Sequence, residues 1–334
     1  MSNVPPPAQL AQLMFGFWAS QAVYVAAKLD LAGLIKDGSK NADELAQATS
    51  THAHSLYRLL RMLASLGVLA EDSASRFSLT AVGQCLRENV PGSQRALALM
   101  AGEEHYQSWG DLMYSIQTGL PAFDKLYGQP IFDWLSQHPE QAAIFDQAMV
   151  SVHGRETAAM LDAYDFKGIK TLADVGGGNG SLLMATLQRN PHLRGMLYDL
   201  PGVIERATPQ FEAAGLTSRC RLISGSFFEA IPTGADAYLM RHIIHDWTDE
   251  QCLTILRHIH KAMPADGRLL VVESVIPPGN DPFFGKQLDL NMLVIPGGQE
   301  RTAAEYEQLF AAAGFKLARI VPTTTEISIV EGVK

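Results

Sequence analysis

The 334-residue sequence has few cysteines and no excess of positive charge, and both absences exclude classes of protein. The three cysteines, Cys85, Cys220 and Cys252, lie far apart and show no CxxC spacing. We therefore expect neither a disulfide framework nor a zinc site, and no bound metal. The formal net charge of -9 argues against a protein that wraps nucleic acid or coats an anionic membrane, because both functions need a basic surface.

Signals for export and for membrane insertion are also missing. The N-terminal residues Met-Ser-Asn-Val-Pro-Pro-Pro lack the basic region and apolar stretch of a secretory signal. No stretch approaches the roughly 20 apolar residues that a membrane span requires. These absences predict a cytoplasmic protein with no membrane partner. Hydrophobic residues make up 47% of the chain, which is enough for a large domain and a smaller second one.

The first 165 residues are predicted to be almost all helical. Apolar residues recur at three- and four-residue spacing from Leu10 to Trp18. Asn41 is placed to cap a helix over 42–48, and a second helix over 54–65 follows. Short strands over 68–70 and 76–79 flank a polar turn. This order of elements is the pattern of a winged helix.

A winged helix can bind DNA, or it can serve for packing and dimerisation. Residues 1–100 contain 8 Lys and Arg against 7 Asp and Glu, and only Arg58 and Arg61 are basic in the second helix. A helix that reads DNA normally carries more positive charge to neutralise phosphates. The composition favours packing and dimerisation. A winged-helix regulator that senses a small molecule is the alternative, and salt-dependent DNA binding would support it.

From about residue 170 strands and helices alternate, which predicts a doubly wound α/β domain of the Rossmann type. The apolar run Leu269–Val272 is typical of a strand buried on both faces of a parallel sheet. We predict that these segments form a seven-stranded, mostly parallel sheet. The predicted strands cover 171–175, 195–199, 220–224, 237–241, 268–274, 315–320 and 327–330, and helices cover 181–189, 202–214, 249–263 and 302–313.

A glycine-rich turn, Asp174–Gly180, follows the first of these strands and opens a helix. Ligands of such sheets bind at this edge, and Gly176 and Gly178 let the backbone approach a ligand closely. Asp199, in Asp199-Leu200, ends the second strand and can accept both hydroxyls of a ribose. Ser181 follows where a dinucleotide fingerprint needs its third glycine, which disfavours a nicotinamide oxidoreductase. Asp174 can instead hold an ammonium group, as S-adenosylmethionine presents.

His245 is the candidate general base. Thr248 and Gln251 form a capping box, so a helix begins there and His245 lies in the preceding loop, on the ligand edge of the sheet. An imidazole near its usual pKa can accept a proton at neutral pH, and a phenol needs to lose one before it attacks a methyl sulfonium. Glu273 and Glu300, at neighbouring loop edges, are candidates to orient the ring.

Together these segments resemble the plant-type small-molecule O-methyltransferases, such as caffeic acid, isoflavone and hydroxyindole O-methyltransferases and their bacterial natural-product relatives. The resemblance rests on Asp174–Gly180, Asp199–Pro201, His245–Trp247 and Pro296–Thr302. It implies a homodimer with a winged-helix dimerisation domain over 1–100, a helical linker and substrate-pocket segment over 101–165, and a methyltransferase domain over 166–334. The implied cofactor is S-adenosylmethionine.

The resemblance also implies roles for single residues. His245 would be the base, flanked by Glu273 and Glu300. The residues implied to contact the cofactor are Asp174, Gly176, Gly178, Asp199, Leu200, Ser226, Phe227 and Arg241. The positions implied to hold an aromatic ring of a small-molecule substrate are Met100, Tyr106, Phe145 and Met149, although each could equally be a core residue of a helix.

Two departures leave alternatives open. Ser226 stands where the family usually has an aspartate that contacts adenine, so one carboxylate contact to the cofactor is absent. Ile295 stands where some plant members carry a polar substrate contact, which leaves the substrate undefined. N-methylation of a nitrogen heterocycle and non-methylating chemistry of a methyltransferase-like protein are the alternatives within the family.

Overall fold

The computed structural model describes residues 4–334, apart from the side chains of His153 and Arg155. The chain divides into two compact units, each with its own set of contacts. The first unit comprises the residues up to 110 together with 135–152, and the second comprises 111–134 together with 153–334.

The first unit contains the predicted helix–turn–helix and hairpin. Helices α4 and α5 are followed by the antiparallel pair β1–β2, with Leu69 opposite Leu79. Asn41 caps α4 in a capping box, because its side chain accepts from the N–H of Glu44 while the Glu44 side chain accepts from the N–H of Asn41. The elements of the first unit are α1 (Pro6–Met14), α2 (Gly16–Lys28), α3 (Leu31–Ile35), α4 (Ala42–Thr49), α5 (Ala53–Ser65), β1 (Leu69–Glu71), β2 (Phe77–Leu79), α6 (Ala81–Gln84), α7 (Arg95–Gly102) and α8 (Glu104–Gly110).

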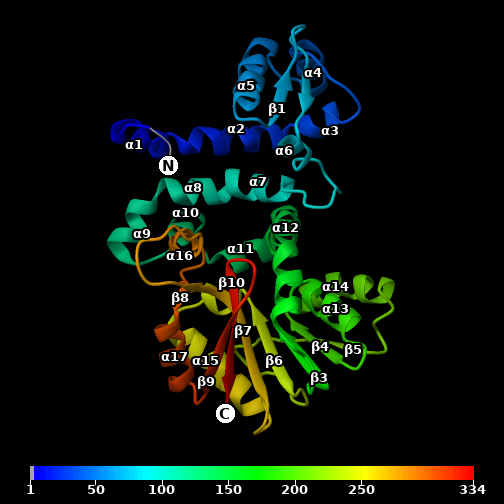
Figure 1. Ribbon diagram of the computed structural model, residues 1–334, viewed down its shortest axis with the longest axis vertical. Helices are drawn as coiled ribbons and strands as arrows, with labels where there is room; N and C mark the ends of the chain where they lie inside the picture. Colours follow the sequence, from blue (N-terminus) through cyan, green and yellow to red (C-terminus); the bar gives the residue numbers. More distant parts are fainter. Residues whose placement is uncertain (1–3) are drawn as a thin grey trace. The chain divides into compact units, whose positions relative to one another are not determined.

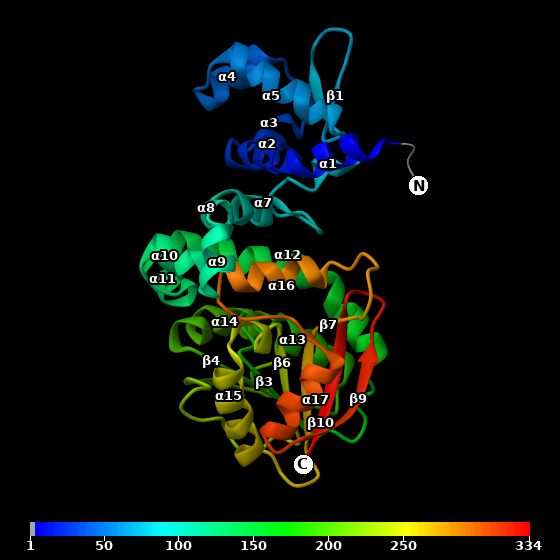
Figure 2. The same cartoon turned by 90° about the vertical axis from the view of Figure 1, so that its left-hand side faces the viewer.

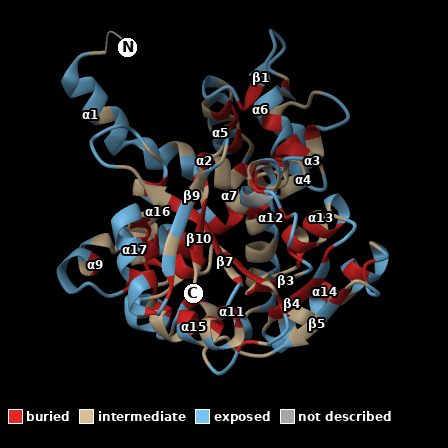
Figure 3. Ribbon diagram, turned by 60° about the horizontal axis from the view of Figure 1, so that its bottom comes forward, coloured by how far each residue is buried: buried red, intermediate tan, exposed pale blue. Residues whose placement is uncertain are grey.

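The N-terminal helices carry apolar side chains that the single chain leaves exposed. Leu13 is 79% exposed and Trp18 is 51% exposed, and α1 is coloured as exposed over most of its length in Figure 3. The segment Pro6–Lys28 is long and apolar enough to cross a membrane by length and composition alone. The expectation that no stretch approaches a membrane span was therefore wrong, because Pro6–Lys28 forms a 23-residue helical segment that passes this test of length and composition.

The second unit is built around one sheet whose strands run in the order β5-β4-β3-β6-β7-β10-β9 (Figure 1). The pairs from β5 to β7 are parallel, whereas β10 is antiparallel to both β7 and β9. The strands are β3 (Thr171–Val175), β4 (Arg194–Asp199), β5 (Cys220–Ser224), β6 (Ala237–Arg241), β7 (Arg268–Ile276), β9 (Lys316–Pro322) and β10 (Ile327–Val333). All seven predicted strands are present. A two-residue strand, β8 (Arg301–Thr302), pairs with the end of β7 and was not predicted.

Helices cover both faces of this sheet and enclose two apolar cores. On one face, α15 and α17 pack against strand residues such as Val271 (Figure 2). On the other, α13 and α14 pack against alternate residues such as Leu270 and Leu172. Successive strand side chains point to opposite faces, so burial on both sides explains the continuous apolar runs in the sequence. The helices are α13 (Ser181–Arg189), α14 (Pro201–Ala213), α15 (Asp249–Ala262) and α17 (Ala303–Ala312).

Further helices precede and interrupt this α/β core. Helix α9 has contacts with both α10 and α16. Helices α11 and α12 each contribute residues to both units. Their bounds are α9 (Leu112–Thr118), α10 (Ala122–Tyr127), α11 (Ile131–Gln137), α12 (Pro139–Ala163) and α16 (Gly285–Val294).

Candidate active site

The glycine-rich turn leaves β3 and opens α13, as the sequence predicts. Gly176 has a φ of 70° and its N–H donates to the carbonyl of Tyr198 at 2.8 Å. A side chain at this position would collide with Ile243 and approach Phe227. Only glycine combines this left-handed backbone with so close an approach of neighbouring side chains. The turn therefore presents bare backbone at the carboxyl edge of the sheet.

Asp199 lies beside this turn at the end of β4. Its Oδ2 accepts from the N–H of Gly178 at 2.8 Å, and its Oδ1 accepts from the N–H of Leu200 at 2.7 Å. These bonds hold the carboxylate against the turn while its side chain stays half-buried. Leu200 is 52% exposed and begins the approach to α14. The carboxylate is thus fixed beside the glycine-rich turn at the carboxyl edge of the sheet.

Asp174 is buried at the end of β3, next to the turn. Its Oδ2 receives no hydrogen bond from any described residue. Burial raises the pKa of Asp174 to about 7, although the positive charge of Arg241 opposes the rise. Arg241 itself donates to Oγ1 of Thr157 at 2.8 Å. A buried carboxylate oxygen without a donor fits an ammonium ligand, which would supply both a hydrogen bond and a compensating charge.

The segment after β5 adds an aromatic wall. Phe227 lies edge-on to Trp247 with ring centroids 5.9 Å apart, and Phe228 lies edge-on to the same ring at 4.8 Å. Ser226 is half-buried and its Oγ accepts from the N–H of Phe228 at 3.3 Å. The Ser226 hydroxyl therefore stabilises the local turn, and the wall near Gly176 is apolar.

The loop that carries His245 is held by its neighbours at many backbone groups. Oε1 of the buried Glu273, on β7, accepts from the N–H groups of Ile243 and Ile244 at 3.0 Å and of His245 at 3.4 Å. The buried guanidinium of Arg301 donates to the carbonyls of Ile244 and Trp247. The backbone N–H groups of the loop are thus bonded to one buried charged side chain and its backbone carbonyls to another. These bonds fix the backbone of the loop and therefore the position of His245.

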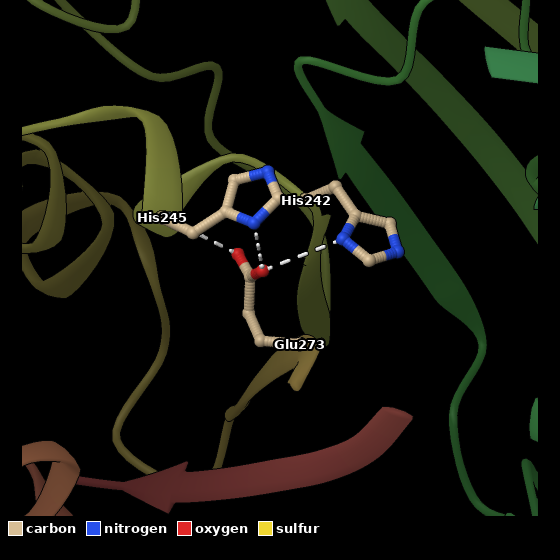
Figure 4. Close-up of side chains that lie close together, drawn as sticks. All are labelled: His242, His245 and Glu273. Carbon is tan, nitrogen blue, oxygen red and sulfur yellow. Dashed lines mark hydrogen bonds and ion pairs between the residues drawn. The ribbon is translucent and has the colours of Figure 1, made fainter. Parts of the chain in front are cut away.

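The ring of His245 meets two buried glutamates. Its Nδ1 lies 2.6 Å from Oε1 of Glu300 and 3.3 Å from Oε2 of Glu273. Its Nε2 lies 3.5 Å from Oδ1 of Asp246. Figure 4 shows Glu273 between the rings of His245 and His242, whose Nδ1 lies 3.6 Å from the same Oε2. The structure thus brings together the three predicted residues His245, Glu273 and Glu300.

These carboxylates change the acidity of the ring. Burial by itself would lower the pKa of His245, but the charges of Glu273, Asp246 and Glu300 outweigh that effect and raise it to about 10. The assumption of an ordinary imidazole pKa was therefore wrong, because the sequence does not show how closely the carboxylates approach. The ring is protonated at neutral pH in this state. Burial also raises the pKa of Asp246 to about 7.

The facing atoms of His242, His245 and Glu273 lie within 4.8 Å of one another. A metal ion could be held by groups at this spacing. Here, however, the ion pairs with Glu273 and Glu300 already engage Nδ1 of His245 and balance its charge. We describe the group as an ion-pair network, and the absence of a metal stays a prediction.

The predicted substrate positions lie in the first unit. Met100, Phe145 and Met149 belong to one small apolar cluster with Ala96 and Ala148. Tyr106, on α8, is 37% exposed. Three of the four predicted positions thus gather in one cluster, and Met100 is buried.

Sequence reasoning missed three residues of the network. His242 and Asp246 flank the predicted base within a few positions, and His-x-x-His-Asp was a usable signal. Asp289, on α16, accepts from the N–H of Glu300 at 2.9 Å and so orients it. An isolated aspartate within a helix carries no comparable signal, because only the tertiary structure brings α16 to Glu300.

Comparisons with known proteins show the family of this chain. The family model described as an O-methyltransferase domain matches residues 109–316, and the O-methyltransferase dimerisation domain matches residues 11–89. The chain belongs to the O-methyltransferase family. Like its relatives, this O-methyltransferase uses S-adenosylmethionine. The matched dimerisation domain includes α2 and the end of α1.

Individual relatives align over almost the whole methyltransferase. Phenazine O-methyltransferase PhzM of Lysobacter antibioticus is 44% identical, over 98% of this chain and 96% of that protein. The crystal structure of LaPhzM superposes with a TM-score of 0.96, at 44% identity and over 99% of both chains. NcsB1 from neocarzinostatin biosynthesis, in complex with S-adenosylmethionine and 2-hydroxy-5-methyl naphthoic acid, is 35% identical with a TM-score of 0.85, over 94% of this chain and 95% of that one. Oxygen is favoured over nitrogen as the methyl acceptor.

Proposed function

We propose that this methyltransferase transfers a methyl group to a hydroxyl of an aromatic small molecule, a secondary metabolite, with His245 as the group that receives the hydroxyl proton. The observation that supports this proposal most directly is the 2.6 Å contact between Nδ1 of His245 and the buried Glu300. Because Nδ1 faces Glu300, Nε2 is the ring nitrogen that we propose exchanges a proton with the substrate hydroxyl.

Bound S-adenosylmethionine would supply an electrophilic methyl group on a positively charged sulfur. Asp174 would hold its ammonium group, and Gly176 and Gly178 would line its methionine part. Asp199 would accept the ribose hydroxyls, with Leu200 at the ribose edge. Phe227 would pack on the adenine, Ser226 would make a weaker contact than an aspartate, and Arg241 would stand at the cofactor edge.

The pKa of His245 is close to that of a phenol. A phenol has a pKa of about 10, so its proton and that of the imidazolium are held with similar strength. The positive charge of the cofactor would oppose the rise in the pKa of His245 by repulsion and lower the pKa of the ring. The ring is already protonated in the free protein, so one proton leaves to solvent when a phenol binds beside it. The proton that remains is shared between the substrate oxygen and Nε2, and the oxygen carries the negative charge needed for attack. Glu273 and Glu300 stabilise the imidazolium that results.

Membership of this family also supports proposals on the oligomeric state, the location, the domains and the substrate contacts of the protein. We propose that the protein acts as a cytoplasmic homodimer, without nucleic acid or membrane partners. The division into 1–100, 101–165 and 166–334 is proposed as dimerisation, linker and catalytic parts. Met100, Tyr106, Phe145 and Met149 are proposed to contact the aromatic ring, because aromatic and thioether side chains form a flat apolar slot.

One experiment tests the reaction itself. The protein is incubated with methyl-labelled S-adenosylmethionine and a panel of phenols and nitrogen heterocycles, and the products are analysed by mass spectrometry. We expect label on the oxygen of a phenol. If only heterocycle nitrogens take up label, the proposed acceptor is wrong. A His245→Ala variant that methylates a phenol as fast as the parent at neutral pH would refute the role of His245.

A further inference from the structure

His258, on α15, is hydrogen-bonded to the aromatic wall of the proposed cofactor site. Its Nδ1 donates to the carbonyl of Phe227 at 2.9 Å. A carbonyl oxygen can only accept, so Nδ1 carries a hydrogen, as it does in the imidazolium and in one neutral tautomer. Among the described residues, this ring is the only group that hydrogen-bonds to the backbone of Phe227. The wall at Phe227 is therefore held by a side chain 31 positions later in the chain.

Phe227 lies directly beside the glycine-rich turn. A Cβ at Gly176 would lie 3.5 Å from Cε1 of its ring, and its ring centroid lies 5.9 Å from that of Trp247. The side chain is half-buried and packs against the core cluster that includes Ile255 and Ile259 of α15. Part of the ring thus contacts the core, and part stays accessible at the edge of the sheet where a ligand binds.

The residues around Phe227 are held by other hydrogen bonds. The carbonyl of Ser226 accepts from the N–H of Glu229 at 2.9 Å, and its hydroxyl accepts from the N–H of Phe228 at 3.3 Å. These bonds close the turn without involving the carbonyl of Phe227. Loss of the bond from His258 would therefore leave this carbonyl free to rotate, together with the Phe227 side chain, while the turn stays closed.

We infer that His258 is a positioning residue that holds the Phe227 ring in the orientation that receives the nucleoside part of S-adenosylmethionine. This inference rests on the proposed contact of Phe227 with adenine. A preformed wall binds a ligand more tightly, because the free energy of ordering the wall is not subtracted from binding. The loop of His245 is fixed separately by Glu273 and Arg301. The effect should therefore appear in the affinity for the cofactor rather than in the methyl transfer step.

Two substitutions of similar size separate the hydrogen bond from the bulk of the ring. In His258→Asn the amide nitrogen Nδ2 is as many bonds from the backbone as Nδ1 of histidine, so it can donate in its place. His258→Leu has no donor, and leucine favours helices at least as well as histidine, so α15 is not weakened. His260→Leu, on the same helix with its ring against Phe315, is the matched control.

We expect the dissociation constant of S-adenosylhomocysteine, measured by calorimetry, to rise about tenfold in His258→Leu. It should stay within about threefold of the parent in His258→Asn and His260→Leu. At saturating S-adenosylmethionine, kcat of His258→Leu should remain within about twofold of the parent, while the KM for the cofactor rises. The inference is overturned if His258→Leu binds as tightly as the parent, or if His258→Asn is weakened as much as His258→Leu.

Thermal unfolding separates positioning from a purely structural bond. A bond that only stabilises the fold lowers Tm equally with and without S-adenosylhomocysteine. A bond that positions Phe227 also reduces the rise in Tm that this ligand produces, because that rise depends on the dissociation constant. We expect a smaller rise in His258→Leu than in the parent or His260→Leu. An equal rise at the same ligand concentration would contradict the inference.

Phe227→Ala distinguishes failure of this inference from failure of the proposed cofactor contact. If Phe227 packs on adenine, Phe227→Ala weakens binding by itself, and adding His258→Leu has little further effect. Weakened binding in Phe227→Ala beside unchanged binding in His258→Leu overturns the role of His258 and leaves the contact standing. Additive effects of the two substitutions also overturn the role of His258 alone. Unchanged binding in Phe227→Ala refutes the contact itself and, with it, the inference.

Discussion

Nδ1 of His245 lies 2.6 Å from Oε1 of Glu300, and both side chains are withdrawn from solvent. The two residues are 55 positions apart in the chain and come from different loops. The N–H of Gln299 donates to the carbonyl of His245 at 2.9 Å, and Oδ1 of Asp289 accepts from the N–H of Glu300. The pair is therefore fixed from both sides, as a proton-accepting group must be to act in one orientation.

Replacement of Glu300 tests this pair. In Glu300→Gln one negative charge beside Nδ1 is lost, so the pKa of His245 should fall and the acid limb of the pH profile should move down. We expect kcat to fall about 100-fold, because the imidazolium formed in the reaction loses a stabilising carboxylate. Steady-state kinetics across pH measure both effects. Glu307→Gln, exposed on α17, is the control, and equal behaviour of the two variants would contradict the assignment.

Asp174 predicts a pH dependence of cofactor binding. Burial raises its pKa to about 7 in the free protein, and only the ionised carboxylate attracts an ammonium group. The affinity for S-adenosylmethionine should be constant above this pH and should fall below it, by about tenfold per pH unit at most. Calorimetry at several pH values measures the dissociation constant. In Asp174→Asn we expect weak binding without this pH dependence; an unchanged pH dependence in that variant would exclude Asp174 as its source.

Asp174 should also lower the free energy of unfolding at neutral and alkaline pH. A carboxyl whose pKa is raised on folding binds its proton more tightly in the native state, so its contribution to stability falls as the pH rises from about 4 to 7. Asp174→Asn removes this penalty. We expect its melting temperature without cofactor to exceed that of the parent by several degrees at pH 8, and by much less at pH 5. An equal increase at both pH values would mean that the gain has another cause.

Arg301 connects the loop of His245 to α15. Its buried guanidinium donates to the carbonyls of Ile244 and Trp247 and to Oδ1 of Asp249 at 2.7 Å. Arg301→Lys keeps the charge but cannot reach these acceptors together, so we expect a loss of about 2 kcal/mol in the free energy of unfolding and a fall in kcat. Denaturant unfolding and kinetics measure the two effects. An Arg301→Lys variant of unchanged stability would show that the several N–H donors of the guanidinium are not needed.

Gly298 should tolerate no side chain. A Cβ at this position would overlap the backbone of His245, Asp246 and Trp247, which cannot move without displacing the base. We expect Gly298→Ala to fold but to lose more than about 100-fold in kcat/KM. Gly16→Ala, where no atom lies within 4 Å of the added Cβ, is the control. Full activity of Gly298→Ala would show that the loop can shift without harm.

The exposed apolar side chains of α1 and α2 predict the site of self-association. In Leu13→Glu combined with Trp18→Glu, two charges would be buried if this face joins two copies of the chain. We expect the dimer to dissociate, as measured by sedimentation at micromolar concentrations. Val82→Glu changes an equally exposed apolar residue on α6 and should leave the mass unchanged. A double variant that remains dimeric would place the interface elsewhere.

Much of the fold and of the ligand edge follows from local sequence. The apolar runs of β3 to β7, the glycines at 176–180 and the capping boxes at Asn41 and Thr248 specify their elements through nearest neighbours and periodicity. The positions of Asp199 and His245 follow as well, because the carboxyl ends of parallel strands meet at one edge of a sheet. In the α/β half, the short strand β8 and the helix α16 were not predicted, and the two residues of β8 carry no periodic pattern.

The chemistry of the site was decided by tertiary structure. Glu273, Glu300 and Asp246 converge on one imidazole from three segments, and this convergence raises the pKa of His245 to about 10. Electrostatic interactions depend on distance and burial, which no local pattern encodes. For the same reason the sequence does not show that His242 belongs to the network. The bend of the backbone after β6 places its ring between Glu156 and Glu273. The sequence by itself determined which residues lie at the carboxyl edge of the sheet. The tertiary structure determined which of them form ion pairs, because ion pairs depend on distances between segments that are far apart in the chain.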